Sequence, residues 1–264
     1  MHVDNRYWAG LLLTVAMVIM AAPAPSAQWV NVPPPVPLWP DGKPNLTAPA
    51  PRAIDGRPDL SGIWEAISVK YLENLAADMK PEDIPYQPWA KALVESRAGG
   101  AHAREESNAN CLPPGVPKTA AAPPPWKIIQ TPSQLAILHE ALTLWRQIFT
   151  DGREFAADLN PSWLGYSIGK WDGDTLVVES RGFNGKTWLD QDGNPTTEAL
   201  HVTERFRRRN IGTLEVQVTI DDLIAYTRPW MVTQEFHLMT SGDLLETICE
   251  NNKDLDHLPG SPLR

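Results

Sequence analysis

The sequence has little positive charge, and this argues against a nucleic-acid partner. It holds 23 lysines and arginines against 32 aspartates and glutamates, so its formal net charge is -9. Proteins that bind nucleic acids need a concentrated basic surface to neutralise phosphates. The basic cluster at residues 205–209 (RFRRR) is interrupted by Phe206 within a strand-like stretch. It is typical of a solvated strand face, so we expect no nucleic-acid partner.

The motifs of the common cofactor-dependent enzymes are also missing. The sequence has no Gly-x-Gly-x-x-Gly run, no Walker lysine loop, no Gly-x-Ser-x-Gly elbow and no His-Glu-x-x-His pair. Such motifs hold phosphates, position a nucleophilic serine or ligate zinc. Their absence predicts a protein with no nucleotide, flavin or zinc cofactor and no metal site.

Long apolar runs are scarce, and the clearest one lies near the start. Residues 11–22 (LLLTVAMVIMAA) follow Arg6 and precede the small residues 24–26 (APS). The run is shorter than the roughly 20 residues that span a bilayer, and the small residues suit a signal peptidase. We therefore predict a cleavable signal peptide over residues 1–27, with an uncleaved anchor as the alternative. The mature chain should be periplasmic or secreted and have no stable membrane span.

Cysteine is equally scarce, since the chain holds only Cys111 and Cys249. An even pair in an oxidising compartment most simply forms one disulfide. Two buried thiols are the alternative. The bridge would join the proline-rich first half to the predicted last strand, and closing so long a loop would stabilise the fold by about 4 to 5 kcal/mol in the chain-entropy model.

Proline, by contrast, is abundant and divides the chain. Most of the 26 prolines lie in its first half. Residues 28–59 should form an extended proline-rich arm, in which residues 41–46 (DGKPNL) are echoed by residues 55–60 (DGRPDL). Residues 60–264 should form a single domain with a helical and loop insertion at about 69–125. Helical spacing starts at residue 69, is broken by prolines, and resumes over residues 89–97.

From Trp126 onward, apolar and polar residues alternate with the period of two that is typical of β-strands. The alternation is sharpest over residues 213–220, and turn motifs such as residues 172–174 (DGD) separate the runs. The last two runs are residues 230–239 and 244–250. The pattern predicts a mainly β fold, an antiparallel meander of seven or eight strands that closes into a barrel, with one or two short helices.

Two short motifs are similar to those of calycin barrels. Gly62-Ile63-Trp64 opens the ordered body, and Arg205 and Arg207 lie in a late predicted strand. This resembles the Gly-x-Trp and distant-arginine pairing of calycins such as lipocalins, although in that family the arginine comes from the final strand. The resemblance implies a lipocalin-like barrel.

Longer stretches resemble a family of uncharacterised exported bacterial proteins. They include residues 160–180 (NPSWLGYSIGKWDGDTLVVES), 197–208 (TEALHVTERFRR) and 248–254 (ICENNKD). The similarity extends over most of the mature chain and implies export. It implies no activity.

Polar residues on otherwise apolar strand faces are the first candidates for chemistry, because burying them is costly unless they bind something. His139, Arg146, Glu204 and Gln234 each share a face with apolar neighbours. Glu204 or His139 could move a proton while Arg146 stabilises negative charge. The alternative is internal satisfaction, such as a structural Glu204–Arg146 ion pair.

Asp190 and His201 are a second candidate pair. Asp190 follows Trp188 and Leu189 in a predicted loop, and His201 lies near the entry of the next strand. A carboxylate that orients a histidine is a plausible acid–base device. The alternative is an exposed loop aspartate and an exposed strand histidine.

Aromatic residues are the candidates for a ligand-binding wall. The chain has 11 tryptophans, most of which we expect in the core. Trp163, Tyr166 and Trp188 lie next to predicted turns, where the mouth of a barrel would open. With Tyr226 and the polar Gln234, they are the predicted contacts for a small apolar or aromatic molecule.

Three functions fit these observations. The leading hypothesis is an exported barrel that binds a small, largely apolar or aromatic ligand in its interior. The second is a cofactor-independent isomerase, lyase or hydratase on the same barrel. The third is an envelope structural or interaction protein whose proline-rich arm docks a partner. A barrel can host all three, so the fold does not choose between them.

Overall fold

The computed structural model describes residues 36–249. The predicted signal peptide (1–27), the first part of the arm (28–35) and residues 250–264 lie outside the described residues. Within residues 36–249, no helix is both long enough and apolar enough to cross a bilayer.

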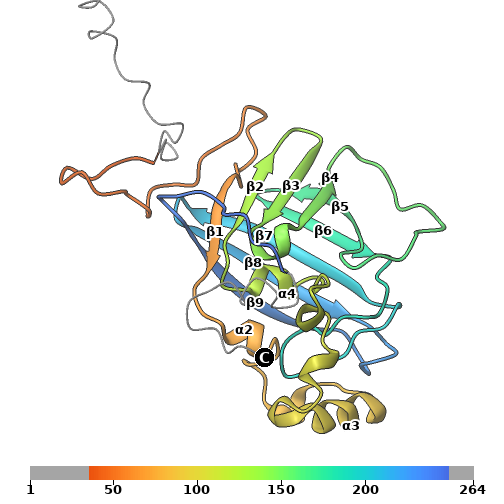
Figure 1. Ribbon diagram of the computed structural model, residues 1–264. Helices are drawn as coiled ribbons and strands as arrows, with labels where there is room; N and C mark the ends of the chain where they lie inside the picture. Colours follow the sequence, from red (N-terminus) through yellow and green to blue (C-terminus); the bar gives the residue numbers. More distant parts are fainter. Residues whose placement is uncertain (1–35, 250–264) are drawn as a thin grey trace, which may run out of the picture. The chain divides into compact units, whose positions relative to one another are not determined.

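The described residues form a closed barrel of nine strands, in which each strand pairs with the next and the last pairs with the first (Figure 1). The strands are β1 (Gly62–Ala66), β2 (Trp126–Gln130), β3 (Gln134–His139), β4 (Trp145–Phe149), β5 (Tyr166–Asp172), β6 (Thr175–Arg181), β7 (His201–Asn210), β8 (Thr213–Asp221) and β9 (Trp230–Leu238). Alternate residues face inward, as in β8, where Leu214, Val216, Val218 and Ile220 are buried. The predicted β-barrel is confirmed.

The pairing departs from an antiparallel meander at one place. β4 and β5 run parallel, and their recorded pairs are Ile148 with Ser167 and Phe149 with Ile168. Parallel neighbours need a crossover connection, which residues 150–165 supply. The prediction of antiparallel pairing is wrong here, because alternation reveals where a strand lies but not its direction.

Aromatic rings pack where the barrel closes. Trp64 and Trp126 are fully buried, and β1 pairs with β9 opposite Phe236. Trp126 and Phe236 meet edge to face with their ring centroids 5.0 Å apart. Such a pair adds about 0.5–1.5 kcal/mol beyond the burial of its area, so this contact helps to hold the closure.

The predicted insertion contains the α-helices of the described chain. They are α2 (Lys70–Glu73), α3 (Pro88–Arg97) and α4 (Lys118–Ala121), with 3-10 helices at Pro81–Asp83, Ala98–Gly100, Ala103–Glu105, Asn108–Asn110 and, after the insertion, Ala141–Thr143. The helix expected over residues 89–97 is α3. The spacing that starts at residue 69 gives only one turn, because Asn74 adopts an extended backbone and ends α2.

The last predicted strand is absent. Residues 244–249 are irregular, and residue 250 lies outside the described chain. The edge of β9 is already taken by β1, so a closed barrel leaves no edge for a further strand. The tail instead passes β2 and β3, where Asp243 pairs with Lys127 and the Leu245 N–H donates to Glu140.

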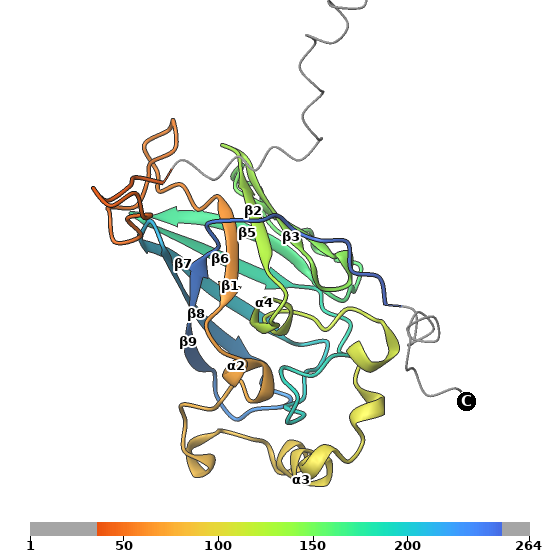
Figure 2. The same ribbon diagram turned by 60° about the vertical axis from the view of Figure 1, so that its left-hand side comes forward.

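Different parts of the chain cover the two ends of the barrel (Figures 1 and 2). The three helices gather toward one end. The arm, residues 36–59, lies at the other, where the carbonyls of Leu46 and Ala48 accept hydrogen bonds from the turn between β7 and β8. Arg52 also binds Asp174 in the turn between β5 and β6, at 2.6 and 2.8 Å. The arm is therefore packed on the barrel by its described part.

The sequence echo in the arm is also a structural echo. The Trp39 N–H donates to the Lys43 carbonyl, and the Ala53 N–H donates to the Arg57 carbonyl, both at 2.8 Å. In each turn, an aspartate side chain accepts from the backbone two residues later at 3.1 Å. Two like sequences thus fold into two like turns.

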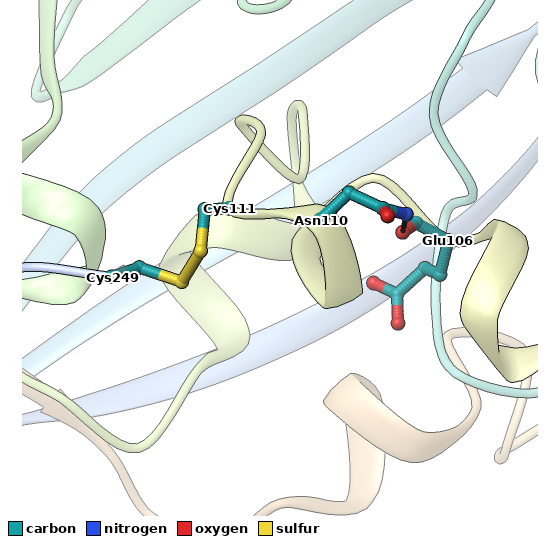
Figure 3. The surroundings of a disulfide bond; sticks show 4 residues. All are labelled: Glu106, Asn110, Cys111 and Cys249. Carbon is teal, nitrogen blue, oxygen red and sulfur yellow. Dashed lines mark hydrogen bonds between the residues drawn. A yellow bond between two sulfur atoms is a disulfide. The ribbon is translucent and has the colours of Figure 1, made fainter. Parts of the chain in front are cut away.

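Cys111 and Cys249 form the predicted disulfide (Figure 3). Cys111 follows the 3-10 helix Asn108–Asn110, in which the Asn110 amide donates to the Glu106 carbonyl at 3.0 Å. The two cysteines are 138 residues apart in sequence. The bond ties the segment that leads into α4 to the C-terminal tail.

A buried arginine on β7 joins the arm, β1 and the turn after β7. The Arg208 guanidinium lies 4.9 Å from the centroid of the Trp64 ring. It donates hydrogen bonds to the carbonyls of Asp59, Ser61 and Ile211. Burial lowers its pKa to about 10, so Arg208 stays charged at neutral pH.

Arg208, and not Arg205 or Arg207, is thus the arginine that meets Trp64. The even-numbered residues of β7 face inward, which leaves Arg207 and Arg209 exposed and Arg205 partly exposed. The prediction of a solvated face is correct for those three side chains and wrong for Arg208. The prediction from this run placed Arg208 on the wrong face and chose the wrong arginine for the contact with Trp64. Both errors have one cause: the run RFRRR was assigned to one face, although successive residues of a strand point to opposite faces.

We expect Arg208→Met to lower the free energy of unfolding by about 2 to 4 kcal/mol, because buried carbonyls lose their donors. Arg207→Met is the matched control on the outer face and should change stability by no more than about 0.5 kcal/mol. Urea unfolding at pH 7 measures both. Equal effects would mean that Arg208 does not join the arm to the barrel.

Candidate functional site

The polar residues predicted from strand alternation lie inside the barrel. Arg146 on β4 and Glu204 on β7 form a two-pronged ion pair, in which Nη1 donates to Oε1 at 3.2 Å and Nη2 donates to Oε2. Both side chains are almost fully buried. This is the internal pair that the sequence allowed as an alternative to a catalytic Glu204, and it engages both carboxylate oxygens.

Two serines complete the hydrogen bonding of the guanidinium. Arg146 Nε donates to Ser167 Oγ at 3.1 Å, and Nη2 donates to Ser180 Oγ at 2.8 Å. The serines lie opposite each other on β5 and β6, with their oxygens 2.9 Å apart. Neither serine was among the residues predicted from the sequence, although Ser180 has the same inward parity as the buried Val178 and could have been found from it.

The ion pair links strands that are distant in sequence. Removing two charges from water is costly, and a buried pair is tolerated only when further hydrogen bonds satisfy it. Here the bonds from Arg146 reach β5, β6 and β7. The pair therefore constrains the register of four strands more than it adds net stability.

His139 and Gln234 face the same interior space with unpartnered atoms. Within the described chain, His139 Nδ1 and Gln234 Nε2 are buried and make no hydrogen bond. Burial, and then the charge of Arg146, lower the pKa of His139 to about 3. The ring is therefore neutral at pH 7. An unsatisfied buried polar group costs about 1 to 3 kcal/mol, so both atoms favour a polar occupant.

The space between these groups is small. The interior cavity measures about 20 Å³, and its lining includes Pro117, Ala120, His139, Arg146, Glu204 and Gln234. That is room for about one water molecule, whereas ligand pockets usually measure about 300 to 1,000 Å³. Pro117 and Ala120 belong to the α4 segment, which fills the interior from one end.

A larger pocket opens on the barrel wall where β4 and β5 meet. The recorded pairs with β5 involve only Ile148 and Phe149, so on this edge the first half of β4 lies beside the turn before β5 and has no strand partner. The resulting hollow, here called the β4–β5 pocket, measures about 450 Å³. Its apolar lining consists mainly of Leu144, Trp145, Phe149, Trp163, Leu164 and Tyr166. Its size and aromatic wall suit a small molecule.

Arg146 connects this pocket to the interior. Arg146 lines both the β4–β5 pocket and the interior cavity, and Ser167 lines the pocket beside it. The floor of an otherwise aromatic pocket is therefore polar. Glu204 holds that floor in place from behind.

Two of the predicted wall residues, Trp163 and Tyr166, lie in the β4–β5 pocket. The Tyr166 ring stacks on Phe149 with centroids 5.3 Å apart, and Arg153 donates to the Tyr166 hydroxyl at 2.9 Å. These contacts hold the ring in one orientation at the pocket rim.

The other two predicted wall residues lie elsewhere. Trp188 is buried beneath the Arg97 guanidinium, which lies 3.9 Å from its ring centroid. Tyr226 is fully buried, and its hydroxyl donates to the Pro195 carbonyl at 3.1 Å. Both belong to loops that pack against each other at an end of the barrel. Proximity to a turn in the sequence therefore did not bring Trp188 to the same pocket as Trp163 and Tyr166.

The structure does not bring Asp190 and His201 together. His201 Nε2 lies 3.5 Å from a Glu179 oxygen. Asp190 is fully buried and accepts hydrogen bonds from the backbone of Leu75, Gly193 and Asn194. Burial raises the pKa of Asp190, while these donors compensate its charge. Asp190 serves as a structural centre for the loops around it.

A second buried ion pair anchors α4 beside Asp190. Lys118 Nζ binds a Glu106 oxygen and donates to the Asp190 carbonyl at 2.9 Å. These contacts join α4 to two other loops. Nowhere in residues 36–249 do three histidine, cysteine, aspartate or glutamate side chains meet in a way that could hold a metal ion.

Comparisons with known proteins add little. No protein-family model matches this sequence, and no curated protein does. The crystal structure of a point mutant of the fluorescent protein UnaG is similar at 14% sequence identity, with a TM-score of 0.33 over 69% of this chain and 96% of that one. A likeness at this level says nothing about what this chain binds.

Removing one member of the buried ion pair should be strongly destabilising. We expect Arg146→Met or Glu204→Leu alone to cost about 3 to 5 kcal/mol, because each leaves an uncompensated charge in the barrel. The double variant should recover most of that loss. Urea unfolding of the wild type, the two single variants and the double variant gives the coupling energy. If the loss in the double variant equalled the sum of the two single losses, Arg146 and Glu204 would not be coupled.

His139 should make stability depend on pH in the acid range. An unfolded histidine takes up a proton near pH 6.5, whereas folded His139 stays neutral down to about pH 3. The unfolded state binds the extra proton between these values, so this contribution to stability is complete above about pH 6.5 and falls by about 1.4 kcal/mol per pH unit below it.

Urea unfolding between pH 7 and about pH 4 tests this, with His139→Phe expected to give a shallower decline. His237→Phe is the control, because His237 is exposed at the outer face of β9. The same slope in wild type and His139→Phe would count against the assignment.

Proposed function

We propose that this protein binds a small molecule with an apolar or aromatic body in the β4–β5 pocket, and that it does so in the periplasm or outside the cell. The observation that carries the proposal is that Arg146 lines both this pocket and the interior cavity. An aromatic wall thus ends on a fixed polar floor, the usual composition of a site that binds and orients a small molecule.

The apolar part of the pocket supports binding of a flat body. Trp145 is 63% exposed, and it shares the pocket with Trp163, Phe149 and Tyr166. Neighbouring exposed aromatic surface marks an interaction site more often than single exposed side chains do. A ligand in the pocket would cover this surface.

The polar floor supports a neutral polar group on the ligand. Glu204 already balances the charge of Arg146, so the charge of an added carboxylate would have no counter-charge at this floor. A carbonyl or hydroxyl oxygen can accept from the guanidinium or from Ser167 without that penalty. The best match is therefore an apolar or aromatic molecule with such an oxygen.

The disulfide supports the location. Disulfides persist in oxidising compartments and are rare in the cytosol. The pairing of Cys111 with Cys249 agrees with the export that the N-terminal sequence predicts.

Native mass spectrometry of the mature protein purified from an envelope fraction, followed by organic extraction, tests the proposal. We expect a stoichiometric small molecule with an apolar or aromatic body. Trp163→Ala should lower its retention by about tenfold or more, since a buried aromatic contact carries much of the binding energy. Trp39→Ala, in the arm and outside the pocket, is the matched control.

Unchanged retention in Trp163→Ala would place the ligand elsewhere. If no molecule is recovered and a panel of aromatic carbonyl and hydroxyl compounds leaves the tryptophan fluorescence unchanged, the proposal fails. A recovered molecule that the protein converts would indicate an enzyme working at the same pocket.

A further inference from the structure

A second site is built around Arg97, the last residue of α3. Its guanidinium lies over the Trp188 ring, 3.9 Å from the ring centroid, and its Nη1 donates to the Gly193 carbonyl at 2.7 Å. Gly193 has a φ of +90°, and a Cβ there would lie 2.5 Å from Arg97 Cδ. Only glycine therefore lets the side chain lie along this loop.

The Arg97 guanidinium makes no direct ion pair, although the charges of Glu105 and Asp190 act on it from a longer distance. Within residues 36–249, no carboxylate lies within ion-pair distance of its guanidinium, and Nε is buried without a hydrogen bond. Burial lowers the pKa of Arg97, as expected of a cation that has lost part of its hydration. A half-buried, unpaired guanidinium is unusual because desolvation is normally offset by an anion.

Arg97 lies in a hollow of about 300 Å³ that adds a second cation. The hollow is lined by Trp89, Leu93, Lys186, Trp188 and Thr196 among others. Lys186 is exposed and forms no ion pair within the described chain. Glu105 also lines the hollow, hydrogen-bonded to His102 Nδ1 at 2.6 Å, and its carboxylate offsets one of the two cations. The hollow is thus net positive on a protein whose net charge is -9.

Trp89 gives the hollow an apolar side. It is 45% exposed, and its indole N–H donates to the Ile224 carbonyl at 2.9 Å, which fixes the ring. Cations and a fixed indole together suit a ligand that has both a negative charge and an apolar body.

We propose that this hollow binds a small organic carboxylate, with the carboxylate directed to Arg97 and Lys186 and the apolar body directed to Trp89. The site lies apart from the β4–β5 pocket and shares no lining residue with it. It also suits a ligand of the opposite charge type, because neither Arg97 nor Lys186 is in a direct ion pair within the described chain, whereas Arg146 is paired with Glu204.

Titration calorimetry with benzoate tests the proposal, and benzamide serves as the uncharged isostere. We expect saturable binding of benzoate with a Kd in the millimolar range or below, and at least about tenfold weaker binding of benzamide. Arg97→Gln should weaken benzoate binding about tenfold or more, and Lys186→Gln about threefold. Rising salt should weaken the benzoate signal.

Two variants keep the test decisive. Lys186→Gln changes an exposed side chain and leaves the fold intact, so its effect stands even if Arg97→Gln unfolds the loop. Trp163→Ala removes a wall of the β4–β5 pocket and should leave benzoate binding unchanged, which separates this site from the proposed function. Equal binding of benzoate and benzamide, no saturation up to about 50 mM, or no effect of Lys186→Gln would overturn the assignment.

Discussion

The ion pair between Arg146 and Glu204 is the constraint to which the rest of the barrel conforms. A guanidinium and a carboxylate can remain in a protein interior only if nearly every donor and acceptor is satisfied. This requirement places Ser167 and Ser180 opposite each other and fixes β4 through β7 in one register. The same ion pair brings a polar residue to the floor of the β4–β5 pocket. Arg146 therefore has a structural role in the barrel and is also available to a bound molecule.

At both ends of the barrel, buried charged groups are also satisfied by hydrogen bonds or ion pairs. At one end, Arg208 gathers the carbonyls of three segments. At the other end, Lys118 pairs with Glu106 and donates to the Asp190 carbonyl. The Asp190 carboxylate in turn accepts a hydrogen bond from the Asn194 N–H. Arg97 departs from this rule, because no carboxylate of the described chain contacts its guanidinium directly and its Nε makes no hydrogen bond. A departure from an otherwise consistent pattern is where functional sites are expected.

Much of the barrel could be predicted from the sequence because strand alternation is a local property. The burial of residues such as Val216 and Val218 follows from the alternation of apolar and polar residues next to them in the sequence. The same parity placed His139, Arg146, Glu204 and Gln234 inside. The direction of β5 could not be predicted, because it depends on a crossover without secondary structure of its own. Nor could the α4 segment inside the barrel, the loop centre at Asp190 or the hollow at Arg97, since each arises where segments distant in sequence meet.

The closure of the barrel has a consequence for how the chain reaches its folded state. β1 must pair with β9, so the first strand of the barrel has no complete set of neighbours until the last one is available. Folds dominated by such non-local pairings form slowly, because a large loop must close before its contacts contribute. The barrel of a nascent chain therefore cannot close until β9 has been synthesised. That delay would suit the proposed export, because a chain whose barrel has not closed can still be threaded through a channel.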